Sequence, residues 1–396
     1  MKKGWELARL DTVIINFIVP QRDRPKVFDG DVPWCRIEDF DGIYLSKSKS
    51  GLCVSEALIE SMPLRVYPAD TVIVSCSADL GRCAIIARPL ITNQTFIGLV
   101  PSENIKPLYL YYLMGHKADH LNAIASGAII KYLSKKKFQE LEIPIPPLSE
   151  QEEIVEVLDT AFAAIDQAKA NIEQNIANAN ELFQSKLNQI FSQKGEGWVE
   201  TTLGDIGTLT SSKRIFKKDY VSSGIPFYRS KEIKELAHGR EISLELFITK
   251  ERYEEIKNKF GIPQKGDILL TAVGTIGEMY VVKGHEEFYF KDGNLMWLKN
   301  FDTLDSYYLK YALTHFVDQL KAMSRGAAYS ALTIEKLKKY SIPVPNDKIQ
   351  REMVLLLDSF KAQQEQLIEA YQTKLASLDE LKKSILQKAF AGELTN

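Results

Sequence analysis

At 396 residues the chain is too long for one compact core, so we expect at least two domains. Charged residues make up 26% of the sequence, and no run approaches the roughly 20 uncharged apolar residues that a membrane-spanning helix requires. The net charge of −2 argues against an indiscriminate nucleic-acid binder. Because residues 1–6 lack the apolar core of a signal peptide, we expect a cytoplasmic protein.

Residues 1–148 are predicted to form a globular domain in which short apolar runs alternate with turn residues. Val, Ile, Tyr and Phe are frequent in these runs, as in Thr71-Val72-Ile73-Val74, and this composition is typical of strands. The domain ends at Ile143-Pro144-Ile145-Pro146, because proline cannot continue a helix and holds its predecessor extended. We therefore expect a mixed α/β domain with a twisted, partly antiparallel sheet.

Residues 149–194 are predicted to form one long helix. Positions 150–193 contain no proline or glycine, and Ser149 and Glu152 stand at the spacing of a capping box. Apolar residues recur at alternating steps of four and three, the pattern of a heptad seam: Ile154, Leu158, Ala161, Ile165, Ala168 and Ile172. Such a helix, roughly 65 Å long at about 1.5 Å per residue, needs a partner to cover its apolar stripe.

The same order of elements then repeats, with a second globular domain at 195–346 and a second long helix at 347–396. Ile143-Pro144-Ile145-Pro146 matches Ile342-Pro343-Val344-Pro345 at an offset of 199, and Val32–Arg36 matches Ile225–Arg229 in the same order. Asp347 and Gln350 repeat the cap, and Lys382 alone breaks the second apolar seam. This period is that of a two-fold tandem duplication and not of a solenoid.

Two helices of matching length in one chain can pack antiparallel as a coiled coil and act as a spacer between the domains. An intermolecular coiled coil that makes a homodimer is the alternative. Charge is segregated along the same boundaries. Each globular segment carries two more Lys and Arg than Asp and Glu, whereas the helical segments together carry six more acidic residues than basic ones. DNA binding therefore requires positive charge to cluster on one face of each domain.

Motifs for catalysis and for metal binding are missing. The sequence has no G-x-x-x-x-G-K-[ST] phosphate loop, no Asn-Pro-Pro-[Phe/Tyr] methyltransferase loop, and no cysteines at zinc-site spacing. Glu232-Ile233-Lys234 and Glu255-Ile256-Lys257 resemble the end of a nuclease metal site, but neither recurs in the first half, so we interpret them as surface residues. His116 and His120 lack an accompanying HExxH glutamate, and we expect an exposed helix face. We predict a chain without an enzymatic centre.

Basic residues mixed with aromatic and small polar residues recur in the predicted loops. The candidate DNA-contacting residues of the first domain are Arg22, Arg24, Trp34, Arg36, Lys47 and Lys49. Those of the second domain are Lys213, Arg214, Lys217, Lys218, Tyr228, Arg229 and Lys231. Lysine and arginine bind phosphates, and a guanidinium group can read guanine in the major groove. For any single residue the alternative is a solvated surface position.

Over essentially its full length the chain resembles the specificity subunits of type I restriction-modification enzymes. The likeness rests on the duplicated order of domain and helix, on Ser149-Glu150-Gln151 and Gln350 after the two proline motifs, on Gly224–Lys231, and on the ending Leu386–Leu394. One departure is that Asn346-Asp347 stands where the first copy has Pro147-Leu148, which concerns the start of the second helix.

The resemblance implies that each domain is a target-recognition domain for one half of a bipartite double-stranded DNA site, with the helices fixing the gap. It also implies two modification subunits that use S-adenosylmethionine and restriction subunits that use ATP and Mg²⁺, with no cofactor on this chain. A specificity subunit that serves a methylase-nuclease fusion is an alternative of the same class. A coiled-coil adaptor whose end domains bind proteins is the alternative outside DNA binding, and the missing catalytic loop disfavours a stand-alone methyltransferase.

Overall fold

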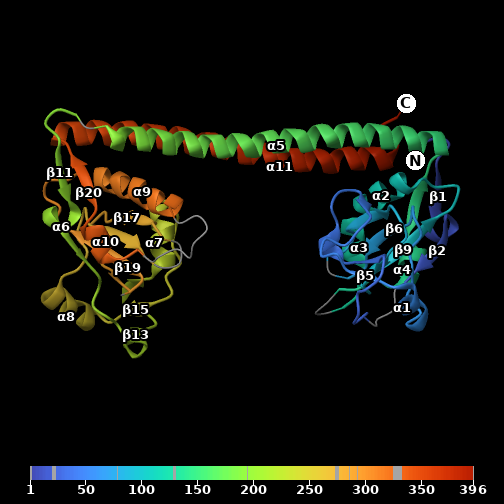
Figure 1. Ribbon diagram of the computed structural model, residues 1–396, viewed down its shortest axis with the longest axis horizontal. Helices are drawn as coiled ribbons and strands as arrows, with labels where there is room; N and C mark the ends of the chain where they lie inside the picture. The colour runs from blue at the N-terminus through green and yellow to red at the C-terminus, as the bar shows by residue number, and fades with distance from the viewer. Residues whose placement is uncertain are drawn as a thin grey trace. The chain divides into compact units, whose positions relative to one another are not determined.

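The computed structural model describes residues 2–19, 24–77, 79–127, 131–193, 195–272, 276–284, 286–291, 293–323 and 332–395. The chain divides into two compact units, Met1–Glu173 with Gln372–Asn396, and Gln174–Tyr371. Each unit contains one globular domain and half of each long helix (Figure 1). In the described part of the chain no helix is long and apolar enough to cross a membrane.

The first domain combines three sheets with short helices. A five-stranded sheet has the order β2-β9-β6-β7-β4, a three-stranded sheet has the order β5-β3-β8, and β1 pairs with β10. The strands are β1 (Glu6–Arg9), β2 (Ile14–Ile18), β3 (Val32–Cys35), β4 (Tyr44–Leu45), β5 (Cys53–Val54), β6 (Val72–Ser75), β7 (Cys83–Ile86), β8 (Ile91–Thr92), β9 (Phe96–Pro101) and β10 (Glu142–Ile145). The helices are η1 (Leu10–Thr12), η2 (Ile37–Asp39), α1 (Glu56–Ser61), α2 (Pro107–His116), α3 (Ala118–Ile124) and α4 (Lys135–Gln139).

The second domain also has three sheets, with the orders β12-β19-β16-β17 and β13-β15-β14-β18 and the pair β11-β20. The strands are β11 (Val199–Thr202), β12 (Thr208–Thr210), β13 (Tyr220–Val221), β14 (Ile225–Tyr228), β15 (Phe247–Ile248), β16 (Ile268–Thr271), β17 (Met279–Val281), β18 (Tyr289–Phe290), β19 (Leu295–Lys299) and β20 (Ser341–Val344). The helices are α6 (Leu203–Ile206), η3 (Lys217–Asp219), α7 (Ser230–Ala237), α8 (Lys250–Phe260), α9 (Ser306–Met323) and α10 (Ile334–Lys338).

The two domains have the same fold. Strand β6 lies antiparallel between β9 and β7, and β16 lies between β19 and β17 in the same way. Strand β3 pairs antiparallel with β5 and parallel with β8, as β14 does with β15 and β18. The mixed, partly antiparallel sheets are those that the sequence predicts, with β4 added in the first domain and β13 in the second.

The long helices are α5 (Leu148–Ser192) and α11 (Asp347–Ala391), each of 45 residues. In the first unit, Lys382 Nζ lies 3.2 Å from a carboxylate oxygen of Asp166. In the second unit, the amide of Gln364 donates to the side-chain oxygen of Asn180 at 2.9 Å. Earlier residues of α5 therefore face later residues of α11, so the helices pack antiparallel and each covers the apolar stripe of the other within one chain (Figure 1).

The residues predicted to cap the long helices lie within the helices themselves. Helix α5 begins at Leu148, so Ser149 lies in the first turn instead of capping it. Helix α11 begins at Asp347, and the side-chain oxygen of Asn346 accepts a hydrogen bond from the N–H of Ile349 at 3.1 Å. Asn346 is therefore the N-cap, and the two helices begin at equivalent points of the repeat.

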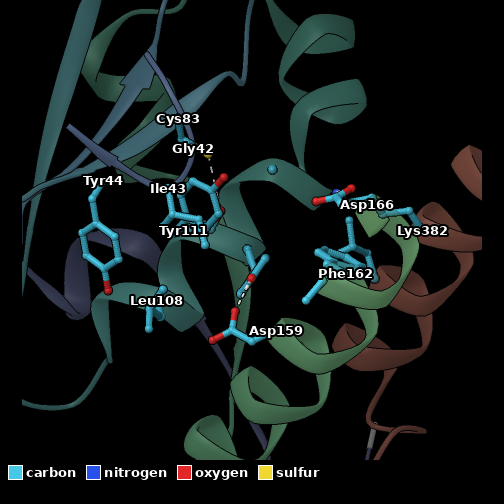
Figure 2. A pocket seen from close by; sticks show the side chains of 14 residues that line it. Gly42, Ile43, Tyr44, Cys83, Leu108, Tyr111, Asp159, Phe162, Asp166 and Lys382 are labelled. Atoms are coloured by element: carbon cyan, nitrogen blue, oxygen red, sulfur yellow. Dashed lines mark hydrogen bonds and ion pairs between the residues drawn. The ribbon is translucent and has the colours of Figure 1, made fainter. Parts of the chain in front are cut away.

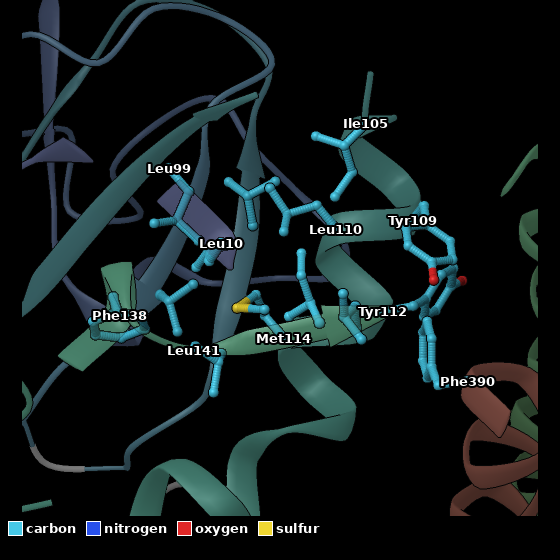
Figure 3. Close-up of a cluster of buried hydrophobic side chains, with 14 of the residues drawn as sticks. Leu10, Leu99, Ile105, Tyr109, Leu110, Tyr112, Met114, Phe138, Leu141 and Phe390 are labelled. Atoms are coloured by element: carbon cyan, nitrogen blue, oxygen red, sulfur yellow. The ribbon is translucent and has the colours of Figure 1, made fainter. Parts of the chain in front are cut away.

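The core of the first unit lies between its five-stranded sheet, α2 and the long helices. Figure 3 shows Leu110 and Met114 of α2 directed toward Leu99 of β9, with Tyr109 beside Phe390 of α11. The rings of Tyr109 and Phe390 are 5.4 Å apart between centroids. In the second unit, Phe191 of α5 packs in the same way against Tyr308 of α9, at 5.5 Å. The end of each long helix thus completes the core of the domain from the other repeat.

Candidate nucleic-acid interface

Trp34, a candidate for DNA contact in the first domain, is a core residue. Its side chain is 2% exposed, and it packs in a small cluster with Val54 and Ile91. The guanidinium carbons of Arg24 and Arg36 lie 5.3 and 5.7 Å from its ring centroid. The ring is therefore closed to stacking on a base, and its visible role is to support the two arginines.

Tyr228 of the second domain is also buried, with 3% of its side chain exposed. Its ring stacks on Phe288 at 4.5 Å between centroids, and its hydroxyl donates to a carboxylate oxygen of Glu286 at 3.2 Å. Burial of both aromatic candidates disfavours their predicted contact with DNA. A period-two strand pattern does not distinguish an outward aromatic ring from an inward one when both faces of the strand are covered.

The lysines near β4 differ in their surroundings. Lys47 is exposed. The N–H of Lys49 donates to a carboxylate oxygen of Asp39 at 2.7 Å, and its ammonium donates to the carbonyl of Phe40 at 3.3 Å. Arg22 lies outside the described residues, so its predicted role stays a prediction.

A buried acid follows the repeated arginine three residues later in both domains. The N–H of Arg36 donates to Asp39 at 2.6 Å, and the N–H of Arg229 donates to Glu232 at 2.7 Å. Both acids are buried, and each is the third residue of its helix, Asp39 in η2 and Glu232 in α7. The interpretation of Glu232 as a surface residue was therefore wrong. The spacing of a capping box was the sequence signal that could have identified this repeated structural feature.

Arg229 and Lys231 face carboxylates. A terminal nitrogen of Arg229 lies 2.6 Å from Glu232 and 2.8 Å from Glu245, and the ammonium of Lys231 lies 2.7 Å from Glu245. The hydrogen bonds from Lys231 and then Arg229 lower the pKa of Glu245 to about 2. A phosphate would have to compete with these acids, which makes the two residues weaker candidates than their sequence context suggested.

The other basic candidates of the second domain lie together before and within η3. Lys213, Arg214, Lys217 and Lys218 are all exposed, whereas Ile215 between them is buried. Among the described residues, no acidic side chain forms an ion pair with Lys213, Lys217 or Lys218. This segment is the strongest candidate for phosphate contact in the second domain, as Arg24 and Lys47 are in the first.

Two glutamines that match after the proline motifs, one of them predicted only as part of a helix cap, join each domain to its long helix. Gln151 accepts a hydrogen bond from the N–H of Lys106 at 2.8 Å, and its amide donates to the carbonyls of Asn104 and Pro146, each at 3.0 Å. Gln350 forms the same three bonds 199 residues later, with Asp305, Thr303 and Pro345. Their match after the proline motifs was the available signal.

Tyrosines of α2 and α9 form a second set of repeated bonds between domain and helix. The hydroxyl bonds are Tyr109 to the Pro144 carbonyl at 2.9 Å, Tyr308 to the Pro343 carbonyl at 2.5 Å, Tyr112 to Asp159, and Tyr311 to Asp358 at 2.6 Å. Burial raises the pKa of Tyr112 and of Tyr311, so both hydroxyls remain protonated donors. These bonds fix the angle at which each domain meets the helices.

A pocket of about 670 Å³ lies at this joint in the first unit, between α2, α5 and α11 (Figure 2). Asp159 at its wall accepts from Tyr112, and Asp166 pairs with Lys382, whose ammonium also lies 4.5 Å from the ring centroid of Phe162. The polar groups of the pocket are thus engaged in holding the helices together. In the described part of the chain, no group of His, Cys, Asp and Glu is arranged to hold a metal ion.

His116 departs from the expected exposed helix face. It is half-buried, and its ring lies 5.2 Å from that of Phe390. His315, at the equivalent position, lies 5.7 Å from the ring of Phe191. Burial lowers the pKa of both histidines. His120 is exposed, as expected.

Comparison with known proteins decides the family. The model of the type I restriction modification DNA specificity domain matches the chain twice, over residues 3–178 and 195–376. The chain belongs to the type I restriction-modification DNA specificity family. The two matches correspond to the two halves of the duplication, and the membership supports a DNA-specificity role without catalysis, as the sequence predicts.

Curated relatives of the family are similar over much or all of the chain. A putative type I restriction enzyme specificity subunit of Haemophilus influenzae is 33% identical over 267 residues, which are 65% of each protein. The MjaIX specificity subunit of Methanocaldococcus jannaschii is 26% identical and aligns with 99% of this chain over 94% of its own length. The EcoBI specificity subunit of Escherichia coli is 27% identical over 83% of this chain and 74% of its own.

Solved structures share the fold of this specificity chain. A chain from a study of complex assembly and conformational transition in a type I R-M system superposes with a TM-score of 0.79 at 21% identity, covering 100% of this chain and 99% of the other. The HsdS subunit from Thermoanaerobacter tengcongensis gives a TM-score of 0.61 at 19% identity, covering 100% and 98%.

Proposed function

We propose that this chain gives a type I restriction-modification complex its DNA specificity, with each domain reading one half of a bipartite double-stranded site. The main support for the proposal is that the two halves form the same hydrogen bonds between domain and helix but differ in the sequence of their basic loops. Gln151 and Gln350 form identical bonds in the two halves, whereas the basic segment 213–218 has no copy of the same sequence in the first domain. One scaffold with two different loop sets suits two different half-sites.

The long helices set the gap between the half-sites in this proposal. Two readers joined by rigid spacers bind together only where both half-sites face the same side of the duplex, so helix length determines the spacing. In this proposal each domain is held in a fixed position on its helix, so that helix length sets the distance between the domains. The hydrogen bonds that hold it are those of Gln151 and Tyr112 in the first domain and of Gln350 and Tyr311 in the second.

Two modification subunits complete the proposed assembly. Exposed apolar residues on the long helices recur at equivalent positions, Val157 with Leu356 and Leu182 with Leu381. Such residues are candidate contact points for a protein partner, and their repetition suits two copies of one partner. We place S-adenosylmethionine on these subunits and ATP with Mg²⁺ on restriction subunits, with no cofactor on this chain, and we expect the complex in the cytoplasm.

The docking prediction is tested with Leu182→Asp and Leu381→Asp together. A carboxylate on each exposed apolar site should weaken binding of the modification subunit about tenfold or more, because charge at the centre of an interface is strongly disfavoured. Gln167→Asp, an equally exposed change on α5, is the control. Titration calorimetry measures the affinity of each variant for the modification subunit. Equal affinities of the double leucine variant and the control would contradict the proposed docking surface.

Exchange of single domains tests the function itself. Cells carrying this chain and its modification subunit should methylate adenines within a bipartite motif, which sequencing of modified bases identifies. Replacing residues 1–148 by those of a relative should change one half of the motif, and replacing 195–346 should change the other. A coiled-coil adaptor would give no methylated motif. A change in both halves of the motif after exchange of one domain would contradict the proposal that each domain reads one half-site.

A further inference from the structure

Phe216 is an exposed aromatic residue within the basic segment of the second domain. Its side chain is 55% exposed, and it directly precedes η3, between Ile215 and Lys217. Figure 1 shows β13, which follows η3, together with β15 and α8 at the end of this domain that lies away from the long helices. Sequence reasoning selected the lysines of this segment and passed over the phenylalanine.

The backbone around Phe216 is firmly held. Ile215 is buried in a cluster with Ile225 and Tyr253. The N–H of Lys213 donates to the hydroxyl of the buried Tyr289 at 2.7 Å, and the N–H of Phe216 donates to Asp219 at 3.1 Å. The ring is therefore presented to solvent by an anchored loop, so its exposure does not arise from a loosely attached chain.

Positive charge without an acidic partner directly follows the ring in sequence. Among the described residues, Lys217 and Lys218 form no ion pair with an acid, in contrast to Arg229 and Lys231 of the same domain. An exposed aromatic ring next to unpaired lysines can bind a ligand that has anionic groups outside and aromatic groups inside. In DNA the phosphates would meet the lysines, and the base stack would meet the ring.

We infer that Phe216 inserts as a wedge into the base stack of the half-site that the second domain reads, while Lys217 and Lys218 hold the flanking phosphates. This inference rests on the proposed function and adds a specificity-determining residue to it. A wedge opens one base step, and flexible steps open most readily. Phe216 would thus contribute sequence preference without a hydrogen bond to any base.

Phe216→Ala in the complex of the full chain with its modification subunit tests the inference. The probe is a duplex with the mapped motif in which 2-aminopurine replaces one base at a time across the second half-site. Apart from the adenine that the modification subunit would flip out for methylation, the wild-type complex should raise 2-aminopurine fluorescence at one further step, because the base there loses a stacking neighbour. Phe216→Ala should abolish this rise and weaken binding about tenfold or more, whereas Phe216→Trp should retain both.

Salt dependence separates the ring from the lysines. Phe216→Ala should leave the slope of log affinity against log salt unchanged, whereas Lys217→Ala should reduce that slope by about one and keep the fluorescence rise. Phe260→Ala is the matched control, because Phe260 is 48% exposed at the end of α8 and lies 5.1 Å from the ammonium of Lys213. We expect it to bind within about twofold of the wild type, because an exposed ring outside the contact contributes little to affinity.

The outcomes distinguish the inference from the function on which it rests. Wild-type affinity and fluorescence in Phe216→Ala would overturn the wedge, and weaker binding by Lys217→Ala in the same experiment would leave DNA reading intact. A wild-type complex that failed to bind the motif would overturn both. Because Phe216 lies outside the buried cores, thermal unfolding should be the same for the variant and the wild type.

Discussion

Two glutamines at equivalent positions connect each domain to its long helix. Gln151 and Gln350 are both buried, and each side chain satisfies one backbone N–H and two carbonyls at the junction. Buried backbone groups need such partners because water cannot reach them. No other side chain of this size offers one acceptor and two donors in the same plane, which accounts for glutamine at both positions.

Gln151→Ala and Gln350→Ala should each lower the free energy of unfolding by at least about 2 kcal/mol, since each leaves buried polar groups unpaired at roughly 1–3 kcal/mol per group. Urea denaturation measures the change. Gln167→Ala, which removes an exposed glutamine bonded only to Asn171, should change it by less than about 0.5 kcal/mol. Equal effects of the three substitutions would contradict a structural role at the joint.

His116 and His315 should make the protein less stable in mild acid. Burial lowers the pKa of each in the folded state below the ordinary 6.5, so the unfolded chain binds protons more readily. The stabilising contribution is complete above pH 6.5 and declines as the pH falls below that value. The urea midpoint should fall between pH 7.5 and 5.5, and the fall should be smaller in His116→Gln/His315→Gln. An identical fall in both proteins would refute this assignment.

Single residues were the least predictable part of the candidate site. Composition located the basic segment 213–218, whose lysines and arginine are exposed as a DNA contact requires. It could not show that Arg229 also faces Glu245 or that Trp34 and Tyr228 are buried, because those facts depend on how separate segments of the chain pack together. Phe216 was missed because an isolated apolar residue in a loop is usually assigned to the core.

At the level of elements, cation–π contacts join the two long helices in both units. The ammonium of Lys382 lies 4.5 Å from the ring of Phe162 in the first unit, and that of Lys361 lies 5.2 Å from the ring of Phe183 in the second. Helix α5 supplies both rings and α11 both lysines. Pairing of two α11 helices would bring these lysines together, so these contacts favour pairing of α5 with α11 over pairing of α11 with another α11. The break that Lys382 makes in the apolar seam is thereby explained.

Exchange of one such pair measures its contribution. Phe162→Lys should destabilise the first unit, because it places two ammonium groups together in a partly buried seam. Phe162→Lys/Lys382→Phe should recover part of the loss, about 0.5–1 kcal/mol for the restored cation–π contact. Thermal unfolding of the two single variants and the double variant gives the coupling energy. A double variant whose loss is the sum of the single losses would exclude the pairwise contact.

Elements with a long regular pattern were well predicted. The heptad seams and the proline motifs identified both helices, because a period repeated over 45 residues outweighs local exceptions. Their antiparallel pairing was predicted from the matching lengths of two helices in one chain. The cap at Asn346 and the short strands β4 and β13 were not predicted. A two-residue strand is determined by its partner across the sheet and leaves little pattern in its own sequence.

On the scale of the whole molecule, each repeat supplies a residue to the hydrophobic core of the domain in the other repeat. Phe390, at the end of the second repeat, closes the core of the first domain, and Phe191 closes the core of the second. Neither repeat contains all the residues of its own core. Each domain core therefore includes residues of a long helix from the other repeat.

Removal of one heptad from α5 and of the facing heptad from α11 tests the central claim most directly. The spacer shortens by about 10 Å at 1.5 Å per residue, so we expect any motif that is still methylated to have a different gap from the original one. Both half-site sequences should stay the same, because the domains are unchanged. Sequencing of methylated adenines in cells carrying the shortened chain and its modification subunit measures both quantities. A methylated motif with the original gap would contradict the account.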